Sequence, residues 1–216
     1  MSYRHSMKDH ITPEVIERLK DKSEEAKDAH TRKIISHIDE VTSEDGSFSD
    51  DISDYEKLYA AGIGHYYLGN YEKCMEAEEK AYPHFNDEMG IAAIFWHTLA
   101  AWRCGREETL FKEHYNIRMD VGHHKSYDLI MALAGGFVSP ESVKLMTEVE
   151  HNPLELSIMG YGFYRWLVRG IEKGDRSLEK TASDVLERVY ADDGFWITYA
   201  YLGARNDKLC GAIFPL

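Results

Sequence analysis

Cysteine and proline are scarce in this chain of 216 residues, which has 3 cysteines and 5 prolines. Cys74, Cys104 and Cys210 lie far apart in the sequence and have none of the paired spacings of a zinc site. Their odd number also argues against a disulfide framework. We therefore interpret all three as small apolar residues that pack in a core.

Two patterns typical of other protein classes are also missing. No run of alternating β-branched residues lies between turn signals, so β-strands have little support. The longest apolar stretches are interrupted by His97, Arg103 or Arg165 well before the roughly twenty residues of a membrane-spanning helix. The polar amino terminus carries no targeting signal. We predict an all-α fold, a cytoplasmic location and no membrane partner.

Basic residues are outnumbered, with 25 lysines and arginines against 38 acids and a net charge of -13. Nucleic acid is therefore not an expected partner, because binding to phosphate backbones depends on positive charge. Between Lys33 and Lys57 the chain has acids but no lysine or arginine. An acidic surface here would steer a basic partner, and the alternative is a solvated loop. The acids are Asp39, Glu40, Glu44, Asp45, Asp50, Asp51, Asp54 and Glu56, of which we assign Asp50, Asp51, Asp54 and Glu56 to the surface.

The clearest positive pattern is a helical hairpin over residues 58–81. Gly69 and Asn70 can adopt the left-handed conformation that ends a helix, and Tyr71 starts a new helical register. About two turns before Gly69 stands Gly62, among other small residues. The first helix therefore has a face with little side-chain bulk, on which a second helix can pack closely.

This hairpin resembles the tetratricopeptide-type repeat, a helix-turn-helix unit of about 34 residues. Gly62, Gly69, Tyr71 and Ala81 stand where that repeat has a small residue, a turn glycine, an aromatic and a small residue. Cys74 is acceptable at a further contact, whereas Glu78 stands where a large apolar residue is expected. Degenerate copies around Gly105 and Gly174 extend the resemblance to roughly half of the chain. It implies stacked hairpins, as a short solenoid or an irregular bundle, that bind a protein or peptide.

The remaining pattern divides the chain into a charged N-terminal helix with an acidic loop, residues 1–53, and a hairpin region, residues 54–216, which we expect to form one continuous domain. Thr12 and Pro13 have the features of a helix start, and the helix is predicted to run to Val41. The serine- and aspartate-rich residues 42–53 are the candidate linker. Further helices are predicted at 54–68, 71–84, 89–104, 107–120, 126–133, 140–149, 153–173, 178–190 and 195–202.

If the hairpins line a concave groove, aromatic and arginine side chains opposite the small-residue face are the candidate binding residues. Such residues are frequent anchors of protein interfaces. The alternative is that these aromatics form the core of a bundle. The candidates are Tyr59, Tyr66, Tyr67, Trp102, Arg103, Tyr164, Arg165 and Arg169.

No catalytic residue, metal site or cofactor is predicted. His114, His123 and His124 lie near acids, but adjacent histidines point to different sides of a helix, and a metal needs three or four convergent ligands. His97 and Cys104 share a helical face but lie about 10 Å apart at 1.5 Å per residue, too far for proton transfer.

The favoured function is a non-enzymatic protein-binding scaffold. The layout is also loosely similar to a family of helical immunity proteins that neutralise bacterial polymorphic toxins. The similarity rests on Phe95-Trp96 followed by Arg103, on Tyr127-Asp128-Leu129, and on the late hairpin at Gly174-Asp175. It implies a basic toxin as the partner. The alternatives are a repeat-type adaptor or co-chaperone that binds a peptide, and an all-α metal-dependent enzyme.

Overall fold

The computed structural model describes residues 11–43, 45–49 and 52–210. These residues form eleven α-helices and no β-strand, which confirms the all-α fold. Three short 3-10 helices lie at Tyr82–His84, Arg176–Leu178 and Asp193–Phe195. The α-helices are α2 (Pro13–Lys20), α3 (Glu24–Val41), α4 (Tyr55–Tyr67), α5 (Tyr71–Ala81), α6 (Asp87–Cys104), α7 (Thr109–His114), α8 (Lys125–Ala134), α9 (Pro140–Val149), α10 (Pro153–Glu172), α11 (Glu179–Ala191) and α12 (Tyr199–Leu209).

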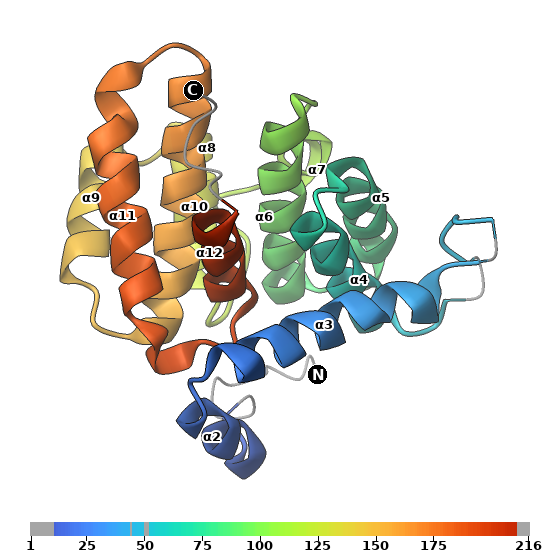
Figure 1. The fold of residues 1–216 in the computed structure, drawn as a ribbon. Helices are drawn as coiled ribbons and strands as arrows, with labels where there is room; N and C mark the ends of the chain where they lie inside the picture. The colour runs from blue at the N-terminus through green and yellow to red at the C-terminus, as the bar shows by residue number, and fades with distance from the viewer. Residues whose placement is uncertain (1–10, 44, 50–51, 211–216) are drawn as a thin grey trace.

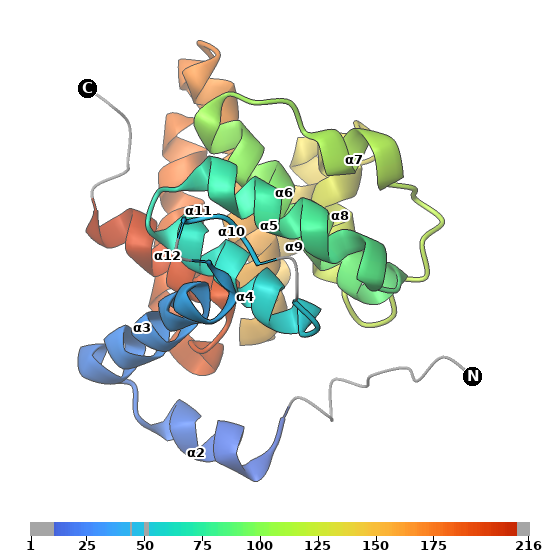
Figure 2. The same cartoon turned by 90° about the vertical axis from the view of Figure 1, so that its right-hand side faces the viewer.

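The helices form two groups joined by a shared core (Figure 1). In one group α4 packs between α3 and α5, and α5 packs against α6; in the other, α10 packs against α8, α11 and α12. The main core includes Trp96 of α6, Tyr161 of α10 and Ala204 of α12, together with Ile34 of α3. Figure 2 shows α2 below α3, at the periphery of the molecule, and α2 has no buried residue.

The predicted single helix over residues 13–41 is wrong, because it is broken between Lys20 and Glu24. Polar side chains at the break compete for backbone groups. Asp21 Oδ1 accepts a hydrogen bond from Ser23 N at 3.0 Å, and Ser23 Oγ accepts one from Ala26 N at 3.2 Å, which caps α3. The predicted cap of the first helix is confirmed, since Thr12 accepts from Val15 N.

The close hairpin of α4 and α5 is confirmed. Gly69 has a φ of +79°, and a Cβ at Gly62 would lie 3.1 Å from Ala77 Cβ and 2.7 Å from Glu78 Oε1. Only glycine therefore fits this helix contact without displacing its neighbours. The predicted turns at Gly105 and Gly174 are also present, with φ values of +67° and +105°.

Glu78 is completely buried against this contact, with an exposed fraction of 0%. Neither carboxyl oxygen has a hydrogen-bond partner. Burial raises the pKa of Glu78 well above its usual value of 4.5. The residue that departs from the repeat pattern is thus a buried carboxyl whose protonated form is favoured by its surroundings.

Two other predicted helices also differ from the observed ones. The helix predicted over 107–120 ends at His114, because Tyr115 is extended and Asn116 Oδ1 accepts from Arg118 N at 3.0 Å to form a turn. The helix predicted over 195–202 instead spans Tyr199–Leu209, with Thr198 as its cap. None of the described helices combines the length and the apolar character needed to cross a membrane.

All three cysteines are free, but only Cys74 is buried. Cys104 is partly exposed and Cys210 is exposed. The core interpretation is therefore correct for Cys74 and wrong for Cys210, which follows the last helix and has little packed against it.

Candidate functional site

The aromatic and arginine side chains expected to line a groove are largely inside the molecule. Tyr66 packs against Trp96 and Tyr161, with ring centroids 5.2 and 6.4 Å away, and the Tyr67 hydroxyl donates to Tyr199 O at 2.7 Å. The assigned faces of α4, α6 and α10 thus pack on one another and leave no open groove between them. The groove prediction is wrong for Tyr59, Tyr66, Tyr67, Trp102, Tyr164 and Arg165, all of which are buried.

The structure nevertheless joins several of these residues in one polar cluster where α6, α10 and α12 meet. Asp207, which is 2% exposed, accepts from Arg103 Nη1 at 2.6 Å and from Arg165 Nη1 at 3.3 Å. Tyr161 donates to the same carboxylate at 3.2 Å, and its hydroxyl lies 2.9 Å from that of Tyr66. One carboxylate is therefore shared by two arginines from different helices. Sequence reasoning missed Asp207, because nothing in the sequence indicates which acid pairs with these arginines.

A second cluster ties the end of α6 to α10. Trp102 Nε1 donates to Glu108 Oε1 at 2.8 Å, and Arg169 forms an ion pair with the same oxygen. The guanidinium of Arg169 also lies over the Trp102 ring, 5.0 Å from its centroid. Arg103 and Arg169 are only partly buried, but both are engaged within the molecule.

The candidate histidines make ion-pair, hydrogen-bond or ring contacts within the fold. His123 Nδ1 lies 2.5 Å from Glu88 Oε1, and His124 Nδ1 contacts the Glu88 carbonyl. His114 stacks on Tyr82 with a centroid distance of 4.5 Å. Within the part of the chain that the structure describes, no three His, Cys, Asp or Glu side chains are grouped so as to hold a metal ion.

His97 forms a compact arrangement with Glu79 and Thr109. Its Nε2 lies 3.1 Å from Glu79 Oε1 and 3.0 Å from Thr109 Oγ1, and the threonine donates to the same Glu79 oxygen at 2.7 Å. In a catalytic triad, one nitrogen of the imidazole contacts the carboxylate that orients it, and the other nitrogen contacts the nucleophile. Here one nitrogen faces both, and Nδ1 is buried without a partner, so the arrangement is structural. Burial lowers the pKa of His97, which favours the neutral ring.

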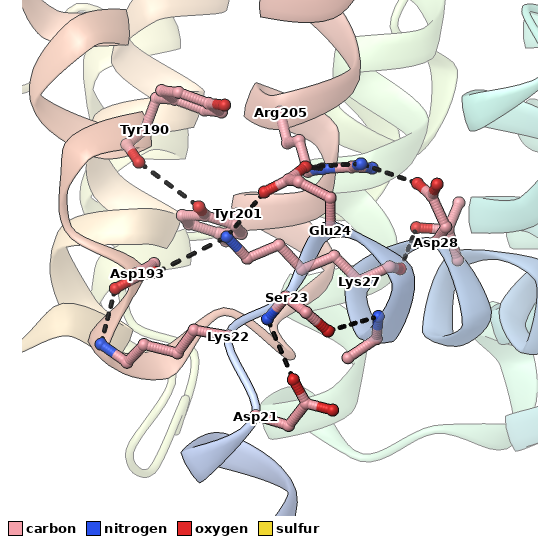
Figure 3. Close-up of polar contacts among 12 residues, drawn as sticks. Asp21, Lys22, Ser23, Glu24, Lys27, Asp28, Tyr190, Asp193, Tyr201 and Arg205 are labelled. Atoms are coloured by element: carbon pink, nitrogen blue, oxygen red, sulfur yellow. Dashed lines mark hydrogen bonds and ion pairs between the residues drawn. The ribbon is translucent and has the colours of Figure 1, made fainter.

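Charged side chains clamp α3 onto the C-terminal region (Figure 3). Lys27, only 5% exposed, lies 3.0 Å from Glu24 Oε1 and 3.5 Å from Asp193 Oδ2. Arg205 of α12 donates to Glu24 at 2.8 Å and to Asp28 at 2.7 Å. The charges drawn together here neutralise one another, so this junction holds the fold together.

The acidic segment is held in place by a buried aromatic side chain. Thr42 and Phe48 form an isolated antiparallel bridge, and Ser49 N donates to Val41 O at 2.9 Å. Phe48 is 3% exposed and packs in a small cluster with Val41 and Leu58. The described parts of the predicted linker, residues 42–43 and 45–49, are therefore anchored to the protein.

Carboxylates around this loop remain at the surface. Asp45, Asp54 and Glu56 are exposed, while Asp54 also accepts from Lys57 N at 3.1 Å and thereby caps α4. Glu40 is exposed and pairs with Lys57 Nζ at 2.7 Å, which lowers the pKa of the carboxyl. Asp50 and Asp51 lie outside the described residues.

A surface that sequence reasoning missed is the outer face of α9. Leu145, Met146 and Val149 are 60%, 46% and 60% exposed, whereas Val143 and Thr147 on the opposite side are buried. The sequence carried a signal for this surface, namely apolar residues on two faces of one short helix. A helix that is covered on one side needs only one apolar stripe, so the second stripe indicates an exposed apolar face.

No family model, curated protein or solved structure matches this chain.

Proposed function

We propose that this protein is a non-enzymatic helical scaffold that binds a basic protein through its acidic segment. The observation that carries the proposal is the exposure of five carboxylates at the end of α3, on the loop that Phe48 anchors and at the start of α4. Fixed charges of one sign raise the association rate with an oppositely charged partner. The acidic segment is Asp39, Glu40, Asp45, Asp54 and Glu56.

The most concrete form of this function is an immunity-type protein that binds and neutralises a basic toxin in the cytoplasm. The net charge of -13 supports a basic partner over an acidic one. A toxin that recognises nucleic acid presents a positively charged surface to it, and an acidic protein competes for that surface. Neutralisation then needs only steric coverage, with no chemistry from the scaffold.

Two other functions have less support. A peptide-binding adaptor would use the aromatic face, but Tyr59, Tyr66 and Tyr164 are buried there. A metal-dependent enzyme would use histidines, but His97 and His123 are hydrogen-bonded or paired to glutamates within the fold. The carboxylates of the acidic segment, by contrast, are exposed and available to a partner.

The test is affinity capture at low and high salt, followed by identification of the partner and metal analysis of the same preparation. We expect one stoichiometric basic protein. The double variant Asp54→Asn/Glu56→Gln should slow its association severalfold at low salt and little at high salt, because charge steering is screened by salt. The matched control is Glu172→Gln, an exposed acid at the end of α10.

An acidic partner, or an association rate that is equal in the variant and the wild type, would contradict the proposal. Stoichiometric metal without a protein partner would favour the enzyme instead. Capture that depends on neither charge nor metal would favour the adaptor.

A further inference from the structure

The outer face of α9 is an apolar surface that nothing in the described chain covers. Leu145 and Val149 are one helical turn apart, and Met146 lies beside them, so the three side chains form a single patch. The inner side of the helix packs through Val143 and Thr147, which are 0% and 1% exposed. The helix is therefore fixed on the protein and presents its second apolar face outward. We call these three side chains the apolar α9 face.

The size of this patch argues against a stable dimer. Three partly exposed side chains provide an apolar area of a few hundred Å² at most, comparable to the largest patch on an ordinary monomer. A stable interface buries about 800 Å² on each partner. The face is the right size for two or three apolar anchors of a short segment, as in the recognition of an amphipathic helix.

An acidic hollow continues from the C-terminal end of this face. Val149 is followed directly by Glu150, which lines an open hollow of about 680 Å³. Glu187, Asp192 and Asp193 also line it, together with the basic residues Lys22, Arg188 and His151. Glu187 is paired with Lys208 of α12. We call this region the acidic hollow.

The lysine and the arginine of the hollow are already engaged within the protein. Lys22 pairs with Asp193 at 2.6 Å, and Arg188 donates to the carbonyls of Thr147 and Glu150 at 2.9 and 2.8 Å. Among the described residues, the carboxylates of Glu150 and Asp192 have no ion-pair partner; they accept only from nearby backbone N–H groups. The hollow is consequently suited to a positively charged group.

We propose that the apolar α9 face and the acidic hollow together form a docking site for an amphipathic helical segment of a partner protein, with apolar anchors followed by lysine or arginine. The apolar side chains pack on Leu145, Met146 and Val149. The basic side chain enters the hollow beside Glu150 and Asp192. Leu145 and Glu150 are five positions apart, about 7.5 Å along the helix, so the basic residue lies one to two turns beyond the anchors. This inference rests on the proposed function in one respect, namely that the chain binds proteins. The docking site that it assigns is a different surface from the acidic segment.

The probe is a synthetic amphipathic peptide with leucines on one helical face and lysines at one end. A matched peptide carries glutamate in place of each lysine. Dissociation constants are measured by fluorescence anisotropy for the wild type and for exposed-residue variants, with circular dichroism to show that each variant is folded. We expect the Leu/Lys peptide to bind the wild type and the Leu/Glu peptide to bind at least about tenfold more weakly, because like charges meet at the hollow.

The variants separate the two parts of the site. Leu145→Ser/Val149→Ser should weaken binding of the Leu/Lys peptide by about tenfold or more, since it removes two anchors. Glu150→Gln/Asp192→Asn should weaken it about threefold and reduce its salt dependence. Leu68→Ser, which changes an apolar residue that is 53% exposed elsewhere, should bind as the wild type does.

The proposal is overturned if the Leu/Lys peptide does not bind the wild type, and three further results would also overturn it. The first is equal binding by the α9 variant and the wild type. The second is equal affinity for the two peptides. The third is a dimer in light scattering that Leu145→Ser dissociates, which would make a second copy the occupant. The variant Asp54→Asn/Glu56→Gln should not change peptide affinity, so failure of the acidic segment as a binding surface is distinguishable from failure of this site.

Discussion

Replacing Glu78 with methionine is expected to make the protein more stable at neutral pH. The carboxyl group is completely buried, and both oxygens lack a hydrogen-bond partner. Leaving a buried polar group unpaired costs about 1–3 kcal/mol, and methionine has a similar length without polar oxygens. Glu78→Met should therefore raise the free energy of unfolding by about 1–3 kcal/mol even where the carboxyl is protonated.

The gain should increase with pH. The pKa of Glu78 is raised well above 4.5 in the folded state by burial, while the unfolded chain releases this proton near 4.5. The stabilisation that comes from the raised pKa is fully present below pH 4.5 and is lost as the pH rises toward the folded pKa. The reason is that the folded state binds more protons than the unfolded state in this window, so the free energy of unfolding falls with pH. Within that window each pH unit lowers the free energy of unfolding by about 1.4 kcal/mol.

Urea denaturation followed by circular dichroism between pH 5 and pH 8 measures both effects. Glu78→Gln is the informative partner variant, since it removes the titration but keeps a polar group in the core. The control Glu25→Gln changes an exposed acid of α3 and should reproduce the wild-type pH dependence. If the wild type and both Glu78 variants show the same dependence on pH, the carboxyl is hydrated or paired in solution and the reasoning is refuted.

Three further predictions concern other buried groups. Asp207→Asn should lower the free energy of unfolding by about 3–5 kcal/mol in urea denaturation, because it leaves two arginines without their shared carboxylate; a loss below about 1 kcal/mol would show that another group neutralises them. Phe48→Ala should cost about 3 kcal/mol and speed proteolysis within 42–53, and unchanged cleavage there would contradict the anchoring role. Burial, assisted by the charge of Arg18, lowers the pKa of His30 to about 4, so the free energy of unfolding should fall as the pH drops from 6.5 toward 4. His30→Gln should lessen that loss, and an unchanged pH dependence over this range would contradict the assignment.

The hairpin was predictable because its determinants are local. Gly69 ends one helix by its own conformational freedom, and the small residue at Gly62 shows where the helices approach. The unusual position of Glu78 was likewise visible, because a charged residue stood in an apolar register. The cap at Thr12 follows the same logic, since its side chain binds a backbone group within its own first turn.

The candidate site was harder to predict because it depends on which helix faces cover one another. A stripe such as that of Tyr59 and Tyr66 has the same pattern whether solvent or α10 lies above it. Periodicity identifies a face but not its neighbour. Ion-pair partners are equally hard to predict from the sequence, since Asp207 is distant in sequence from both of its arginines. On the outer face of α9 the opposite occurs, because no other helix of the described chain covers its apolar residues.

The clamp between α3 and α12 has a consequence for synthesis of the chain on the ribosome. Glu24 and Arg205, which it joins, are separated by 181 positions. Helix α3 can pack on α4 as soon as both have emerged, because they are neighbours in the chain. Lys27 gains Asp193, and Glu24 gains Arg205, only when the final helices have been made. The clamp can thus close only after α12 has emerged, and shorter nascent chains leave Lys27 without Asp193 or Glu24 without Arg205.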